Sequence, residues 1–380
     1  MLLPNQKSLF SIPPGITFLN CAYMSPLLKR ANEAGIEALQ KRSHPWEIVI
    51  DDWFTPGETL RSLFAQIIQA NSDNVALIPS VSYGIATAAK NIVLRADQNI
   101  VLLDQQYPSN VYAWRELARE TKSTIVTVIR RDDESWTEAI LKHITTDTGL
   151  VAIPNCHWTD GSLIDLEVIS KRTKAVHAKL VIDASQSLGA YPLNIQKIQP
   201  DFLVTVGYKW LMGPYGLGYL YAAPEYCESG KPLEHSWLNK KESENFTRLV
   251  DYQDAYKTGA RRFDAGEFPN FNNIAMAIAA LTQILEWGVE NIQETLGALT
   301  NKIESRAQQI GLGVPPATMR ASHLIGISFP FEQIPALSKR VADHKVYVSF
   351  RGEKMRIAPH LYNDEQDVER LFEVISKIRS

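Results

Sequence analysis

Two residues whose side chains could take part in a chemical reaction, a lysine and an aspartate, each lie at the end of an apolar segment. Lys209 closely follows the run FLVTV and precedes Trp-Leu-Met, so we expect its amine to be shielded from water. Burial lowers the pKa of an amine and makes it a usable nucleophile toward carbonyl groups. Asp183 ends the run KLVID, where a carboxylate can bind a protonated pyridine nitrogen. Taken singly, the lysine could instead extend to solvent at a strand end, and the aspartate could cap a turn.

Other strand ends carry groups that complement this pair. The small polar stretch SVSYG, residues 80–84, precedes a predicted helix over 85–94, and free N–H groups at a helix start can cradle a phosphate. Tyr107 in DQQYPSN could stack on a planar ring, and Gln186 could reach a phenolic oxygen. Asn155-Cys156-His157-Trp158 ends a further strand. Together these groups supply what pyridoxal 5′-phosphate (PLP) requires: a phosphate cradle, a stacking ring, a pyridine partner and a Schiff-base lysine.

The segments that position these groups alternate between strand and helix character. Apolar runs at residues 74–79, 99–103, 124–129, 150–153, 179–182 and 202–206 are separated by segments of helical period. Such near-continuous apolar strands predict an α/β fold with a parallel sheet covered on both faces. Functional groups gather at the carboxyl ends of strands in that architecture. The polar residues there are Ser80, Ser82, Asp104, Asn155, Asp183 and Lys209.

A chain of 380 residues exceeds what one core usually serves, so two domains are expected. We predict a large domain over 16–250 and a smaller α+β domain from 1–15 and 251–380. The second unit should contain a long helix over 274–287, strands near 324–329 and 355–358, and an amphipathic helix at the chain end.

The composition argues against a nucleic-acid-binding, secreted or membrane protein. A net charge of −3 gives no general attraction to nucleic acid or to an anionic membrane. The start, MLLPNQKSLF, lacks the pattern of a secretory signal, and no apolar run is long enough to span a bilayer. The three cysteines lie far apart and form neither a metal-ligand spacing nor a disulfide framework. A cytoplasmic location is therefore expected.

The stretch VIDASQSLGAYPLNIQKIQPDFLVTVGYKWLMGPYGLGYLY resembles the class V aminotransferase family of fold-type I PLP enzymes, alongside cysteine desulfurases, kynureninase and isopenicillin N epimerase. Its specific features are the Asp-x-x-Gln to Lys spacing and the Lys-Trp-Leu-x-Gly-Pro run. Further matches are FLNCAYMSPL, YPSNVYAW, HWTDGSLIDL, GARRFDAGEFPNF and RIAPHLYN, so the resemblance spans nearly the whole chain. It implies a large domain with a mostly parallel seven-stranded sheet and a homodimer with shared active sites.

The resemblance also implies roles for individual residues. Lys209 matches the lysine that holds PLP as an internal aldimine, and Asp183 matches the partner of the pyridine nitrogen. Arg356 matches the arginine that grips the substrate α-carboxylate, a task suited to a bidentate guanidinium. The other implied contacts are Gln186 and Asn155 near the phenolic oxygen, Val81, Ser82 and Tyr208 at the phosphate, Tyr107 on the ring, Asn20 beside the substrate, and Phe271 and Asn272 toward the partner's phosphate.

Two positions depart from the family pattern. Val206 stands where the family often has serine, so one phosphate hydrogen bond is missing or comes from Thr205 or the partner chain. Desulfurases carry a nucleophilic cysteine shortly before the carboxylate arginine, and the corresponding stretch VADHKVYVSFRGEKMR has none. A persulfide-forming desulfurase is therefore not expected. Cys156 reads more readily as a small buried hydrophobe than as its replacement.

The predicted function is chemistry at the α-carbon of an amino acid, with transamination favoured. The alternatives are a PLP-dependent β-lyase without the loop cysteine, for which His157, His44 or Tyr23 could serve the leaving group, and an amino-acid epimerase. A non-catalytic relative is not favoured, because the lysine, aspartate and arginine are all present. A nicotinamide dehydrogenase loses support, because no Gly-x-Gly-x-x-Gly follows an early strand.

Overall fold

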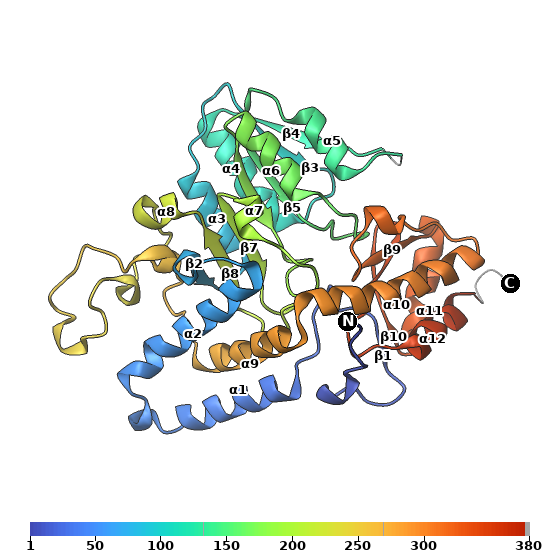
Figure 1. Cartoon of the computed structure of the whole chain (residues 1–380), viewed down its shortest axis with the longest axis horizontal. Helices are drawn as coiled ribbons and strands as arrows, with labels where there is room; N and C mark the ends of the chain where they lie inside the picture. Colours follow the sequence, from blue (N-terminus) through green and yellow to red (C-terminus); the bar gives the residue numbers. More distant parts are fainter. Residues whose placement is uncertain (132, 269, 377–380) are drawn as a thin grey trace.

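The computed structural model describes residues 1–131, 133–268 and 270–376. Its centre is a seven-stranded sheet in the order β2-β8-β7-β6-β5-β3-β4 (Figure 1). Only β8 runs antiparallel to its neighbours among these strands, so the predicted mostly parallel seven-stranded α/β sheet is confirmed. The strands are β2 (Val75–Ile78), β3 (Asn99–Leu103), β4 (Thr124–Val128), β5 (Thr148–Pro154), β6 (Lys179–Asp183), β7 (Phe202–Val206) and β8 (Gly218–Ala222).

Both faces of this sheet are buried, which explains the near-continuous apolar strands. In β2, Val75 and Leu77 join one core while Ala76 and Ile78 join the other. The helices on the second face are α3 (Val81–Asn91), α4 (Tyr112–Thr121) and α8 (Pro224–Ser229). Those of the first face are α2 (Ile50–Ile68), α5 (Trp136–His143), α6 (Leu166–Ala175) and α7 (Ile195–Ile198), together with α1 (Lys29–Arg42) and α9 (Phe271–Trp287).

The remaining elements gather on one side of this sheet, where a third apolar core forms (Figure 1). An antiparallel sheet has the order β11-β12-β9, and β1 pairs with β10 in parallel. The strands are β1 (Thr17–Phe18), β9 (Ile325–Ser328), β10 (Val346–Tyr347), β11 (Ser349–Arg351) and β12 (Lys354–Ile357). The helices are α10 (Val289–Gln309), α11 (Ile334–Asp343) and α12 (Glu365–Ser376).

Most elements predicted for the second unit are confirmed. The helix near 274–287 and the strands near 324–329 and 355–358 are present as α9, β9 and β12. The predicted chain-end helix is observed as α12 up to Ser376, and residues 377–380 lie outside the described part of the chain. The domain division at residue 250 stays a prediction; α9, which follows it, packs along α1 and α2.

One local prediction was wrong in a way that matters for the site. The helix expected from residue 85 begins at Val81, so SVSYG forms its first turn rather than a separate loop. Ser80 is the N-cap, because its hydroxyl accepts a hydrogen bond from the Tyr83 N–H at 3.2 Å. The helix packs so closely on the sheet that a Cβ at Gly84 would lie 2.6 Å from Val204 Cγ1. The start of α3 is thereby fixed at the end of β2.

No helix in the described residues has the length and apolar character needed to cross a membrane. The cytoplasmic location stays a prediction.

A buried ion pair between α2 and the segment before α9 holds β2 in place. The Arg61 guanidinium of α2 forms a bidentate pair with Asp264, and it also donates to the Val75 carbonyl at 2.8 Å. Asp264 in turn accepts from the Leu77 N–H at 2.7 Å. Both side chains are almost fully buried, so each charge depends on the other for stabilisation.

Replacing Asp264 with asparagine should therefore destabilise the fold severely. Arg61 would keep its buried charge with only the more exposed Glu58 carboxylate, at 3.1 Å from its Nε, as an ionic partner. Removing one partner of a buried ion pair typically costs roughly 3–5 kcal/mol in the free energy of unfolding. Denaturant unfolding of Asp264→Asn measures this cost. Asp97→Asn, which breaks an exposed pair with Arg95, is the control and should change the unfolding midpoint little. Equal midpoints for the two variants would contradict the anchoring role.

Candidate active site

The carboxyl ends of the parallel strands meet at one edge of the sheet, and the predicted residues converge there. Lys209 follows β7, Asp183 ends β6, Cys156 follows β5 and Tyr107 follows β3. One pocket lies among them. Its lining consists of Val81, Gln106, Tyr107, Asn110, Pro154, Cys156, Trp158, Asp183, Ser185, Gln186, Val206, Tyr208 and Lys209.

The Lys209 amine has the environment of a nucleophile. Burial lowers its pKa to about 8, against the attraction of Asp183, and the positive charges of Arg356 and Arg351 lower the pKa further. The amine lies 5.5 Å from the centre of the Tyr107 ring and 5.9 Å from that of Tyr208. Within the described residues it forms no ion pair. A substantial neutral fraction near physiological pH is what attack on a carbonyl requires.

This pKa predicts how fast the protein takes up its cofactor. Covalent attachment of PLP to cofactor-free protein should accelerate as pH rises and level off above about 8, because only the neutral amine attacks the aldehyde. Stopped-flow absorbance across a pH series on both sides of 8 measures the rate. A rate that stays flat or falls through this range would show that another group controls attachment.

Asp183 offers a buried carboxylate to the same pocket. Its oxygen accepts a hydrogen bond from the Ser185 N–H at 3.0 Å. Burial raises the pKa of this carboxyl, against the hydrogen bonds from Ser185 and the charge of Lys209. A protonated ring nitrogen brought against it would supply the cationic donor that a buried carboxylate needs. This environment fits the pyridine nitrogen of PLP.

Gln186, three residues on, is held by the protein at both ends of its amide. Its oxygen accepts from the Trp210 indole at 3.0 Å and its nitrogen donates to the Ala22 carbonyl at 3.1 Å. The amide nitrogen carries a second hydrogen, which leaves one donor for a cofactor oxygen. The predicted contact with the phenolic oxygen stays a prediction.

The phosphate cradle was predicted at the start of α3, and that role stays a prediction. The N–H groups of Val81 and Ser82 lie in the first helical turn, where they have no intrahelical acceptor, and Ser82 is exposed. Tyr208 lines the pocket, and burial raises the pKa of its phenol to about 12, so it remains a hydrogen-bond donor. Thr205, considered as a substitute for the missing serine, bonds to the Val206 carbonyl at 3.2 Å and does not line the pocket.

Tyr107 and Trp158 form an aromatic wall. Their rings meet edge to face, with centroids 5.4 Å apart and an interplanar angle of 82°. The Trp158 indole donates to the Gln105 carbonyl at 2.7 Å, which fixes its orientation. Tyr107 is 39% exposed, so a planar ring in the pocket could cover its face. Its stacking role stays a prediction.

Arg356 of β12 is fully buried, yet one of its nitrogens has no partner. Nε donates to the Ser349 hydroxyl at 2.9 Å and one Nη to the Trp158 carbonyl at 2.8 Å. The other Nη is buried without a hydrogen bond among the described residues. Burial and then the charge of Arg351 lower the pKa of Arg356 to about 9, so it stays charged at neutral pH. A buried guanidinium with a free donor and no carboxylate suits the binding of an anion.

The N-terminal segment connects this arginine to the lysine. Asn20 bridges to Ala358, two residues beyond Arg356, and the Ser25 N–H donates to the Tyr208 carbonyl at 3.0 Å. Asn20 is buried, and its side-chain oxygen has no hydrogen-bond partner within the described chain. Its role as a residue that borders the substrate stays a prediction.

Four predicted cofactor residues are not among the lining of this pocket: Ser82, Asn155, Phe271 and Asn272. Asn155 is buried, and its amide donates instead to the Ile164 carbonyl at 3.3 Å. Phe271 and Asn272 lie at the start of α9, where the Phe271 ring packs edge-on against Trp53 at 5.5 Å. Their predicted contact with a partner's phosphate stays a prediction, as does the role of Asn155.

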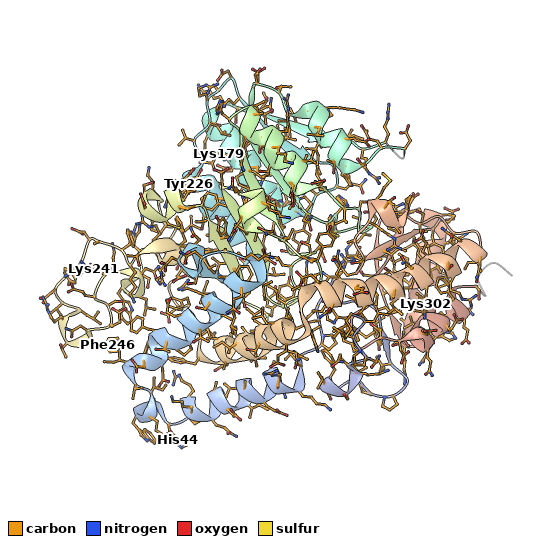
Figure 2. The ribbon with its side chains drawn as sticks, viewed as in Figure 1. His44, Lys179, Tyr226, Lys241, Phe246 and Lys302 are labelled. Atoms are coloured by element: carbon orange, nitrogen blue, oxygen red, sulfur yellow. The ribbon has the colours of Figure 1, made fainter. Side chains whose placement is uncertain are left out.

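None of the three candidates for a leaving-group acid is among the lining residues of the pocket. His157 is buried, stacks on Trp136 at 5.2 Å and bonds to Thr159 at 2.8 Å, outside the pocket lining. His44 is exposed at the end of α1, well away from the sheet (Figure 2). Tyr23 is 58% exposed, and its charge influences Arg351 and Tyr208, so it lies near the site.

All three cysteines are buried and free of disulfide bonds. Cys156 lines the pocket, but burial raises the pKa of its thiol far above the physiological range. The β11–β12 hairpin has only Gly352 and Glu353 between its strands, so it has no loop to carry a further thiol. This arrangement supplies no thiolate for persulfide formation.

Sequence reasoning missed several residues that line the pocket or lie beside it. Ser185 orders Asp183, and Gln106 donates to the Asn110 carbonyl within the pocket wall. Arg351 faces Trp158, with its guanidinium carbon 5.3 Å from the ring centre. Alternation along the hairpin strand could have identified Arg351, because Ser349, Arg351 and Arg356 share one face.

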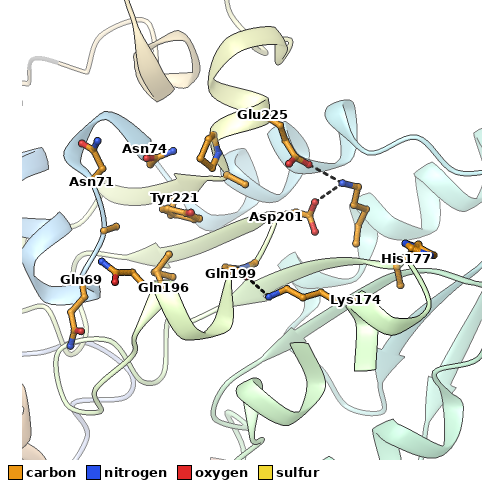
Figure 3. A pocket seen from close by; sticks show the side chains of 17 residues that line it. Gln69, Asn71, Asn74, Lys174, His177, Gln196, Gln199, Asp201, Tyr221 and Glu225 are labelled. Carbon is orange, nitrogen blue, oxygen red and sulfur yellow. Dashed lines mark hydrogen bonds and ion pairs between the residues drawn. The ribbon is translucent and has the colours of Figure 1, made fainter. Parts of the chain in front are cut away.

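A larger hollow lies at the opposite end of the strands (Figure 3). Its charged groups already have partners: Lys179 pairs with Asp201 at 2.8 Å and Glu225 at 2.9 Å, and Lys174 bonds to Gln199 at 2.6 Å. In open α/β sheets, ligands bind at the carboxyl ends of the strands. The smaller pocket around Lys209 is therefore the candidate active site.

Comparisons with known proteins identify the fold and the family. A cysteine desulfurase from Thermococcus onnurineus NA1, solved in its apo form, superposes with a TM-score of 0.85 at 20% identity and covers 100% of this chain and 99% of its own. A complex of the cystine C-S lyase C-DES with cysteine persulfide gives a TM-score of 0.83 at 17% identity over 95% and 97%. At these identities the likeness concerns the fold.

Sequence relatives extend over the same length. The uncharacterized aminotransferase YcbU of Bacillus subtilis is 27% identical over 98% of both chains. Kynureninase of Geobacillus thermodenitrificans is 22% identical over 97% of this chain and 90% of its own. The family model described as aminotransferase class-V matches residues 55–371. The chain therefore belongs to the class V aminotransferase family, as predicted, and its cofactor is pyridoxal 5′-phosphate, which the site fits.

Proposed function

We propose that this enzyme is an aminotransferase that transfers the amino group of an amino acid to a keto acid. The observation that carries the proposal is one pocket that combines a nucleophilic lysine, a buried carboxylate and, beside it, a buried arginine with an unpaired donor. These are the groups needed to hold PLP and to orient an amino acid on it. YcbU, similar over its full length, carries the name aminotransferase, which supports this choice among the family's reactions.

When bound, PLP supplies an electron sink for the negative charge that develops on the α-carbon. Lys209 holds the cofactor before substrate arrives, and its freed amine then moves the α-proton, acting as general base and then as general acid. With a pKa of about 8, about a tenth of the amine is neutral at pH 7, so both the proton-accepting and the proton-donating form are present. Asp183 keeps the ring nitrogen protonated, and Tyr107 packs against the ring.

Arg356 would bind the α-carboxylate of the substrate. Ser349 and the Trp158 carbonyl hold the guanidinium in place, and its remaining Nη donor is free for a carboxylate oxygen. Fixing the carboxylate orients the α-hydrogen toward Lys209, which lies close enough for the two positive charges to interact. Asn20 borders the substrate from the N-terminal segment.

None of the residues predicted as a leaving-group acid lines the described pocket, which favours proton transfer over β-elimination. Cys156 is held neutral by burial, and His157 packs outside the pocket. Besides Asp183, which is assigned to the ring nitrogen, Lys209 and two tyrosines are the described lining groups that can readily exchange protons with a bound ligand. Transamination needs only the lysine for its proton steps, whereas departure of a β-substituent is assisted by a separate acid.

Incubating the holoenzyme with single amino acids tests the proposal. Formation of the matching keto acid together with an aminated cofactor, followed by release of a new amino acid when a second keto acid is added, is the expected result. Sulfide or pyruvate from cysteine or cystine would identify a β-lyase, and inversion of the α-carbon without keto acid would identify an epimerase. Either outcome would overturn the transaminase proposal while leaving the cofactor site intact.

We further propose that the active unit is a homodimer. Phe271 and Asn272 lie outside their own pocket, and an apolar groove runs between α1, α2 and α9 beside them. A second copy covering this groove would bring the start of α9 toward the partner's site. Light scattering on the holoenzyme should give twice the chain mass of 42.7 kDa, and a monomeric active enzyme would contradict the proposal.

A further inference from the structure

Arg351 is a second arginine near Arg356, the residue proposed to bind the substrate α-carboxylate. The proposed reaction does not require Arg351. It ends β11 of the tight hairpin that also carries Arg356. Ser349 pairs with Arg356 across the hairpin, so alternation places Arg351, two residues from Ser349, on the same face. Gly352 with φ of +55° makes the two-residue turn that keeps the arginines this close.

The guanidinium of Arg351 is directed toward the pocket wall. Its central carbon lies 5.3 Å from the centre of the Trp158 ring, and Trp158 lines the pocket beside Tyr107. Stacking on an indole holds a guanidinium in place while leaving its edge donors available. Arg351 is half-buried, so a ligand entering beside Trp158 can meet these donors.

Arg351 has no carboxylate partner among the described residues; its side chain bonds only to the Phe350 carbonyl, at 2.6 Å. Its positive charge lowers the pKa of both Lys209 and Arg356, so three cationic groups act on one site. Asp183 is the only carboxylate that lines the described pocket, and the pyridine nitrogen is its expected partner. Such an excess of positive charge favours a ligand with more than one negative group.

We propose that Arg351 binds the side-chain carboxylate of a dicarboxylic amino acid or of its keto acid, while Arg356 binds the α-carboxylate. This inference rests on the proposed function and names its substrate class. One carboxylate satisfies the free donor of Arg356, and the second finds the exposed edge of the Arg351 guanidinium beside Trp158. Neutral amino acids of the same length would leave Arg351 without an anion.

Calorimetric titration of the holoenzyme with glutarate and with glutaric acid monoamide tests this proposal without turnover. The two probes have the same length, and they differ in the charge of one end. Glutarate should bind more tightly, and Arg351→Gln should weaken glutarate about 10- to 100-fold while changing the monoamide little, since charged hydrogen bonds contribute about 1.5–3 kcal/mol. Arg351→Lys should restore part of the preference.

Lys354→Gln is the matched control. This residue lies opposite Arg351 in the hairpin and has the same charge, but its amine bonds to Ser328 at 2.6 Å. The control should keep the wild-type preference for glutarate. Equal binding of both probes by the wild type, no binding of either, or an equal loss of both in Arg351→Gln would overturn the assignment. Because the readout is binding, a lyase or epimerase result in the turnover assay would reject the transaminase proposal separately.

Discussion

Lys209→Ala should lose covalent cofactor attachment and nearly all turnover. The variant lacks the amine that forms the bond to the cofactor, and it also lacks the group that moves the α-proton. General acid–base catalysis alone contributes about 10²–10⁴-fold, so a rate loss of at least this size is expected. Absorbance spectra before and after borohydride reduction measure attachment, and product formation from an amino acid substrate measures turnover.

The fold should survive this change, because the Lys209 amine forms no ion pair within the described chain. Lys171→Ala, which removes an exposed amine on α6, is the control and should retain both cofactor and rate. Retention of a reducible cofactor and of wild-type turnover by Lys209→Ala would show that the lysine has been assigned wrongly. Added methylamine, which can replace the missing base, should recover part of the rate if proton transfer is the lost step.

Arg356→Met should reduce kcat/KM for amino acids by about 10²-fold or more. Removing one partner of a buried charge pair typically costs roughly 2–5 kcal/mol of binding, and the substrate carboxylate would be the partner left behind. Steady-state kinetics with an amino acid and with the amine that lacks its carboxylate measure this effect. The amine should react at similar rates with both enzymes.

The unfolding midpoint of Arg356→Met distinguishes a role in substrate binding from a role in stabilising the fold. Arg356 is buried and charged without a carboxylate partner in the described residues, so replacing it with an apolar side chain should leave the unfolding midpoint unchanged or raised. Arg370→Met, at a half-buried position on α12 outside the pocket lining, should leave the kinetics unchanged and alter stability little, since it removes one hydrogen bond to the His344 carbonyl. A lower midpoint together with an equal loss of amine and amino-acid turnover would indicate that Arg356 supports the fold instead.

The large sheet was predictable because its physical cause is local. Strands buried on both faces must be apolar throughout, and runs such as 99–103 and 202–206 have the observed bounds. Since parallel strands end at one edge, Lys209, Asp183 and Tyr107 could be placed in one site without knowledge of the strand order. The aromatic, carboxylate and amine groups do line one pocket.

Other elements of the fold form because of contacts between residues far apart in the chain, and these contacts cannot be predicted from the local sequence. The helix α2 contains Pro56 followed by glycine, a pattern that usually ends a helix, and no element was predicted there. The strand β8 begins at Gly218 after a glycine-rich turn and pairs between β2 and β7, which only the folded chain brings together. Arg351 reaches the site through the pairing of β11 with β12, so its neighbours cannot be read from its own segment.

The most direct test of the central claim is to identify the residue that carries the cofactor. The purified holoenzyme is reduced with borohydride, digested and examined by peptide mass spectrometry. A phosphopyridoxyl group on Lys209, in the peptide that contains Tyr208 and Trp210, is the predicted result. An active enzyme whose reduced cofactor is attached to a different lysine, or to none, would contradict the account.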